Sequence, residues 1–80
     1  MKDKLTKFGL TLAINTHLDG VRSVYLFEQV IPQLKVDERG YILSREIEKL
    51  IIVLRIIVPR APDKIDGVKF QNMLDFLNNY

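Results

Sequence analysis

Cysteine is absent from the sequence, and histidine occurs once, as His17. Without cysteine no disulfide bond can form, which predicts a reducing compartment and a cytoplasmic location. The same scarcity excludes a cysteine nucleophile and a zinc site, because zinc takes several thiolate or imidazole ligands. His17 and Asp19 could orient a proton transfer, but the sequence places no nucleophile with them. We therefore predict that the protein is not an enzyme and holds no metal or cofactor.

Long hydrophobic runs are also missing. The longest, "LIIVLRIIV" at residues 50–58, has nine residues and contains Arg55, whereas a helix needs about 20 apolar residues to cross a bilayer. The run in "MKDKLTKFGLTLAIN" is broken by Thr11, and no small-residue cleavage site follows it. The sequence therefore predicts a protein that neither crosses the membrane nor carries a signal peptide.

Charge of one sign is not in excess either. Twelve basic and ten acidic residues give a net charge of +2, and each half of the chain carries six basic and five acidic side chains. This balance is too weak to indicate nucleic-acid binding by itself. The apolar fraction of 48% is typical of a folded chain, and the length predicts one domain over residues 1–80. So short a chain buries only about 60% of its unfolded surface, which favours oligomers.

The hydrophobic spacing predicts a mainly α domain of four helices, at residues 2–17, 20–34, 44–58 and 66–79. Asp19, Ser44 and Asp66 are the expected N-caps, because short polar side chains accept hydrogen bonds from the free N–H groups of a first turn. "LDGVR" and "IDGVK" surround two of these residues, and we interpret them as independent caps rather than an internal repeat. Residues 7–15 also alternate between apolar and other side chains, so a strand is the alternative there.

Residues 35–46, "KVDERGYILSRE", resemble the calcium-binding loop of the EF-hand family. Gly40 matches the sharp turn of that loop, Asp37 a ligand position and Glu46 the final bidentate carboxylate. However, Lys35 and Arg39 stand at two positions where oxygen ligands belong, and their charges repel a divalent cation. We therefore expect a surface turn that does not bind calcium.

The helix expected at residues 44–58 carries more apolar surface than one face requires. Ile47, Leu50, Ile51, Leu54, Ile57 and Val58 cover one broad face, while Ile52 and Ile56 point to the side of Arg45 and Lys49. This second strip must be covered by the N-terminal segment or by a partner. From this strip we predict a small regulatory or adaptor protein that acts through protein–protein interaction as a homodimer. Its partner-binding residues would be Arg45, Lys49, Ile52 and Ile56.

A small DNA-binding accessory protein is the alternative function. A basic helix face can contact phosphates, and basic residues cluster at the start of the chain and on the third helix: Lys2, Lys4, Lys7, Arg45, Lys49 and Arg55. However, Glu46 and Glu48 share that helix, and the sequence has neither a helix-turn-helix glycine nor an RNA-binding aromatic motif. Nucleic acid is therefore the second choice of partner.

Overall fold

Four α-helices form the protein in a computed structural model, which describes residues 4–80. They are α1 (Lys7–His17), α2 (Val24–Val30), α3 (Ser44–Ile57) and α4 (Lys64–Asn78). One 3₁₀ turn, η1 (Ile31–Gln33), extends α2, and a second, η2 (Val58–Arg60), follows α3. The predicted mainly α fold is confirmed, and the strand alternative for residues 7–15 is wrong because this segment is helical.

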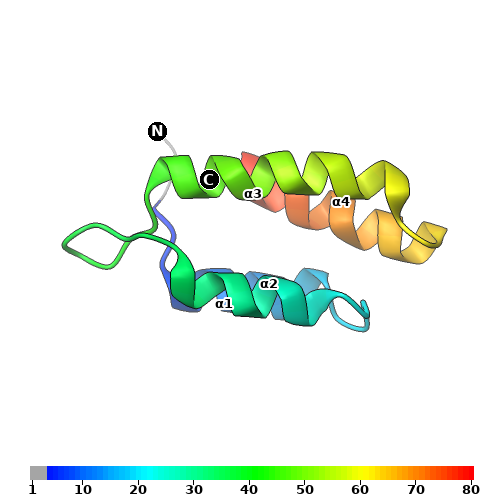
Figure 1. Ribbon diagram of the computed structural model, residues 1–80, viewed down its shortest axis with the longest axis horizontal. Coiled ribbons are helices and arrows are strands. Elements are labelled where there is room, and N and C mark those ends of the chain that lie inside the picture. The colour runs from blue at the N-terminus through cyan, green and yellow to red at the C-terminus, as the bar shows by residue number, and fades with distance from the viewer. Residues whose placement is uncertain (1–3) are drawn as a thin grey trace.

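The helices form two layers, each a pair of consecutive helices (Figure 1). One layer contains α1 and α2, the other contains α3 and α4, and the layers meet where α1 packs on α4. Over the described residues, no Cα atom of α2 lies within 8 Å of a Cα atom of α3. The two layers are therefore closed on the side of α1 and α4 and separated on the side of α2 and α3.

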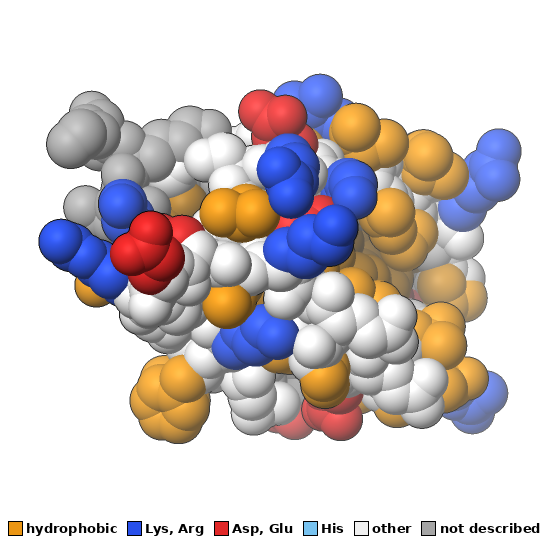
Figure 2. All heavy atoms as spheres, turned by 60° about the vertical axis from the view of Figure 1, so that its left-hand side comes forward, with side chains coloured by type: hydrophobic (Ala, Val, Ile, Leu, Met, Phe, Trp, Pro, Cys, Tyr) orange, Lys and Arg blue, Asp and Glu red, His pale blue; other side chains and the backbone are white. Residues whose placement is uncertain are grey.

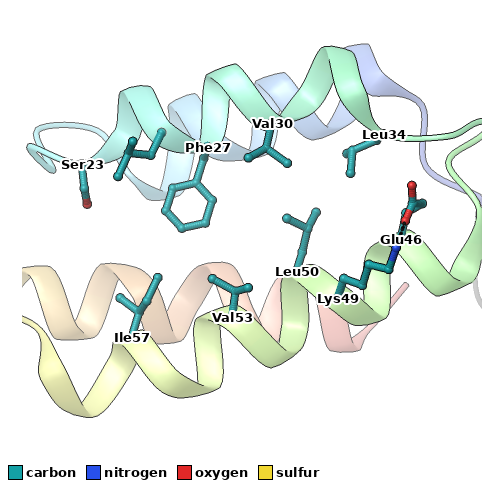
Figure 3. A pocket seen from close by; sticks show the side chains of 10 residues that line it. Ser23, Phe27, Val30, Leu34, Glu46, Lys49, Leu50, Val53 and Ile57 are labelled. Atoms are coloured by element: carbon teal, nitrogen blue, oxygen red, sulfur yellow. Dashed lines mark ion pairs between the residues drawn. The ribbon is translucent and has the colours of Figure 1, made fainter.

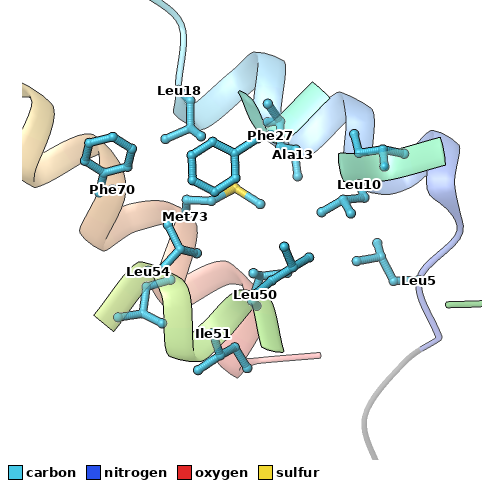
Figure 4. Packing of buried hydrophobic residues seen from close by; sticks show 14 of the residues in the cluster. Leu5, Leu10, Ala13, Leu18, Phe27, Leu50, Ile51, Leu54, Phe70 and Met73 are labelled. Carbon is cyan, nitrogen blue, oxygen red and sulfur yellow. The ribbon is translucent and has the colours of Figure 1, made fainter. Parts of the chain in front are cut away.

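The core lies between the layers and receives side chains from all four helices (Figure 4). Apolar residues that recur at helical spacing are buried, including Phe27 and Ile31 of the α2 segment and Phe70, Met73 and Leu77 of α4. The rings of Phe27 and Phe70 are tilted against each other with centroids 6.2 Å apart. Such aromatic pairs add to the stability that burial alone provides, so this contact fixes α2 against α4.

A short hairpin between α2 and α3 ties the N-terminal segment to the fold. Val36 and Ile42 form an antiparallel bridge, and Thr6 forms another with Tyr41. The Ile42 backbone N–H donates to the Leu5 carbonyl at 2.7 Å, while the Leu5 side chain is buried. Because these contacts hold Leu5 and Thr6, the two residues cannot extend α1 toward the N-terminus. Helix α1 therefore begins at Lys7 rather than at the predicted residue 2. Residues 2 and 3 of that prediction lie outside the described residues.

The predicted N-caps are wrong at all three positions. α2 begins at Val24, because the turn at Gly20, with φ of 82°, separates Asp19 from it. α3 already includes Ser44, and the residue before it, Leu43, holds its extended conformation by donating its N–H to the Lys35 carbonyl.

At α4 the cap is Asp63, which follows Pro62 in an extended conformation. Its carboxylate accepts from the Asp66 N–H at 2.8 Å. The Thr6 hydroxyl plays the same role at α1, where it accepts from the Gly9 N–H at 3.0 Å. Asp66 therefore lies in the first turn of α4, where its negative charge suits the positive helix end.

Candidate protein-binding surface on α3 and the adjoining groove

The strip predicted on the third helix is exposed. Ile52 is 56% exposed and Ile56 is 53% exposed, and Val53 between them is 44% exposed. The N-terminal helix α1 does not cover them, because it packs against α2, η1 and α4. Within residues 4–80 the alternative of internal covering is therefore wrong. Ile52, Val53 and Ile56 form what we call the α3 strip.

The two cations predicted beside the strip have different surroundings. Arg45 is exposed, whereas the Lys49 ammonium lies 3.0 Å from a carboxylate oxygen of Glu46. The Glu46 side chain is buried, and its other oxygen accepts from the Lys35 backbone N–H at 3.0 Å. These contacts lower the pKa of Glu46, first through the Lys35 N–H and then through Lys49. Glu46 thus joins the hairpin to α3 and fixes the position of Lys49.

An apolar groove adjoins the α3 strip, in the space where α2 and α3 separate (Figure 3). Leu26, Phe27, Val30 and Leu34 form one wall, and Leu50, Val53 and Ile57 form the other. Ser23 lies at one end, and Glu46 and Lys49 lie at the opposite end. The free volume is ≈ 300 Å³, at the lower limit of ordinary ligand sites. We call this feature the α2–α3 groove, and Val53 belongs both to it and to the α3 strip.

The sequence pattern did not predict the α2–α3 groove. One signal was present: Leu26 and Val30 are four residues apart and off the face formed by Phe27 and Ile31. In the structure Leu26 is 49% and Val30 is 37% exposed. A second apolar face on a helix as short as α2 indicates another surface to be covered.

Exposed apolar surface and positive charge occur together near the hairpin end of the molecule (Figure 2). On the right of that view, hydrophobic side chains extend along the side on which α2 and α3 separate, next to a group of Lys and Arg side chains. A site of this composition suits protein contact better than chemistry, because it has an apolar centre and a charged rim.

The segment that resembles a calcium loop uses its carboxylates internally. Asp37 accepts from the N–H groups of Tyr41 at 3.0 Å and Arg39 at 2.9 Å, and these bonds, the Tyr41 bond most, lower its pKa. Gly40 has φ of 86°, as the sharp turn requires. Among residues 4–80 no group of three or more histidine or acidic side chains is placed to hold a metal ion. The loop is therefore a hydrogen-bonded turn, and the absence of calcium binding stays a prediction.

His17 and the basic N-terminal residues have structural contacts of their own. The His17 ring lies 5.5 Å from the Phe76 ring at the end of α1. The Lys4 ammonium lies 4.0 Å from Asp37, and the Lys7 ammonium donates to the Pro32 carbonyl at 2.9 Å. Lys2 lies outside the described residues. These contacts occupy two of the lysines on which the DNA-binding alternative depends.

The fold and this surface define a small all-α domain with an uncovered apolar face. Comparisons with protein-family models, curated proteins and solved structures find no match for the chain. Along residues 4–80 no helix has the length and apolar character that crossing a bilayer requires.

Proposed function

We propose that the protein is a small regulatory or adaptor protein that acts through protein–protein contact, as a homodimer joined through the α3 strip. The observation that supports this proposal is the exposure of Ile52 and Ile56, each more than half open to solvent on the longest apolar stretch of the sequence. Complete burial of such a side chain contributes about 1.5–3 kcal/mol. A second copy that covers both residues on each subunit would recover a large part of that contribution.

The composition of the strip suits a second copy of the chain. Its residues are aliphatic and β-branched, as in permanent dimers, whose interfaces resemble a core divided in two. Arg45 and Lys49 lie at its border, where water and salt screen the repulsion between subunits. Because an 80-residue chain has a small core, dimerisation also adds stability that the isolated domain lacks. A cytoplasmic location, inferred from the absence of cysteine, is part of the proposal.

The double substitution Ile52→Ser/Ile56→Ser tests this function. Light scattering after size-exclusion chromatography should show a dimer for the wild type and a monomer, or an unfolded chain, for the variant. Leu12→Ser is the matched control, because Leu12 is 51% exposed on α1, away from the strip, and its mass should equal that of the wild type. A dimer that survives the double substitution would place the interface elsewhere.

The DNA-binding alternative is tested with the same samples. Binding to phosphates releases counterions, so affinity for duplex DNA would fall steeply as salt rises. We expect no tight binding to mixed duplex DNA at low salt. Tight, salt-sensitive binding that is unchanged by Ile52→Ser/Ile56→Ser would replace the proposed function by the alternative.

A further inference from the structure

The α2–α3 groove is long enough to bind one helix. Its α3 wall runs from Glu46 to Ile57, which at a rise of 1.5 Å per residue is about 16 Å, or three helical turns. The opposite wall runs from Ser23 to Leu34 in the reverse direction, because Ser23 lies at the end of Ile57 and Leu34 at the end of Glu46 (Figure 3). A helix laid between these walls would contact both along its whole length.

The volume of the groove sets how much a partner can insert. An apolar cavity of about 150 Å³ holds one benzene-sized group, so ≈ 300 Å³ accommodates two or three large aliphatic side chains. Amphipathic helices supply this number over two turns, at positions i, i+3 or i+4, and i+7. Leu26 is 49% and Val30 is 37% exposed, so both would be buried against the flanks of such a helix.

The charges around the groove indicate which charge a bound helix would carry. Among the described residues that line it, Glu46 is the one acidic residue, and its carboxylate is paired with the Lys49 ammonium at 3.0 Å. Lys35 and Arg45 are exposed next to Leu34 and Glu46 in the sequence, at the same end of the groove. At the other end, Arg22 is exposed and precedes Ser23. The borders of the groove are therefore basic at both ends.

The neighbouring carboxylates do not neutralise these borders. Glu28 is two residues from both Leu26 and Val30, so it lies on the opposite side of α2. Glu48 lines a separate depression with Ile52 and Arg55, away from the groove. Complementary charge therefore requires carboxylates at the ends of the occupant.

We propose that the α2–α3 groove binds an acidic amphipathic helix of a partner protein, which inserts aliphatic side chains between α2 and α3 and directs carboxylates to Lys35 and Arg45. This role goes beyond dimerisation through the α3 strip and does not depend on it. In a homodimer each subunit would present one groove, so the protein would hold two copies of its partner.

The probe that tests this proposal is a fluorescein-labelled amphipathic peptide of about 14 residues, with leucines on one helical face and glutamates on the other. A second peptide carries lysine in place of every glutamate. Fluorescence anisotropy with the 80-residue chain should show binding of the acidic peptide that weakens as salt rises. The lysine peptide should bind at least about tenfold more weakly. Equal binding of the two peptides would overturn the assigned partner chemistry.

Substitutions in the groove locate the site. Leu26→Glu places a carboxylate on the groove wall and should weaken binding of the acidic peptide by at least about tenfold. Val30→Glu is a second variant for the same wall, and circular dichroism of both checks the fold. Leu12→Glu is the matched control, because Leu12 is 51% and Leu26 is 49% exposed, and it should change affinity by less than about twofold. An equal loss in Leu12→Glu would exclude the groove as the binding site.

The mass of the same variants separates this proposal from the homodimer. Leu26→Glu should keep the oligomeric state of the wild type while losing the peptide, because Leu26 lies outside the α3 strip. A wild-type monomer that binds the acidic peptide would refute the homodimer and leave the groove proposal intact. If Leu26→Glu instead converts a dimer to a monomer, a second copy of the chain occupies the groove and the partner helix is excluded.

Discussion

Two substitutions on opposite sides of one turn of α3 test the orientation of this helix, on which the α3 strip depends. Leu54 is 1% exposed and belongs to the core between the layers (Figure 4), whereas Ile52 is 56% exposed. Leu54→Ala should therefore lower the free energy of unfolding by about 2–5 kcal/mol, because it removes buried methyl groups and leaves a cavity. Ile52→Ala should lower it by about 1 kcal/mol or less, since under half of that side chain is buried.

Thermal unfolding followed by circular dichroism measures this difference. In a domain of this size each kcal/mol shifts Tm by about 4–8 °C, so Leu54→Ala should lose at least about 8 °C. The comparison is made in dilute samples, where self-association contributes little to Tm. If Ile52→Ala were as destabilising as Leu54→Ala under these conditions, Ile52 would be buried within the subunit and the strip would not exist.

The dependence of Tm on protein concentration gives a second test with Ile52→Ala and Leu54→Ala. Because dimerisation stabilises the folded state by mass action, Tm of the wild type should rise with protein concentration. Ile52→Ala should make Tm less dependent on protein concentration. Leu54→Ala should lower Tm but leave its dependence on concentration as in the wild type. The same rise in both variants would show that Ile52 does not contribute to the interface.

Three further predictions concern acid, glycine and calcium. The lowered pKa of Glu46 contributes stability that is complete above its ordinary value of about 4.5 and is lost as pH falls below it. In urea unfolding, the free energy of unfolding of the wild type should fall as pH drops below this value, and that of Glu46→Gln should fall less. Glu46→Gln should also be less stable than the wild type at pH 7. Gly40→Ala should cost about 1–2 kcal/mol, because φ there is 86°, whereas Gly67→Ala, inside α4 with ordinary contacts at 3.6 Å, should gain up to about 1 kcal/mol. Calorimetry with millimolar calcium should show no saturable heat.

The four helices could be predicted because each buries a face with a helical period. Phe70, Met73 and Leu77 recur at this spacing, and all three are buried. The helix starts could not be predicted in the same way, because a cap depends on backbone conformation. Asp63 and Asp66 are both suitable capping residues, and only the extended conformation of Asp63 decides between them.

The candidate site was predictable in part. The spacing of Ile52 and Ile56 along α3 placed them off its broad apolar face, but only the structure shows that they are exposed. The groove depends on how far α2 stands from α3, and no pattern within either helix records that distance. It follows from contacts between distant residues, such as α1 with α4 and the hairpin with Leu5. The function of the surface stays a prediction from its exposure and charge.

Sedimentation equilibrium of the wild-type protein over a wide range of concentration tests the homodimer most directly. The proposal predicts a mass of twice 9.3 kDa in concentrated samples. It also predicts that Ile52→Ser/Ile56→Ser removes this species while a folded or unfolded monomer remains. A wild-type mass of 9.3 kDa at every concentration would contradict the proposal, because Ile52 and Ile56 would then stay exposed in a monomeric protein.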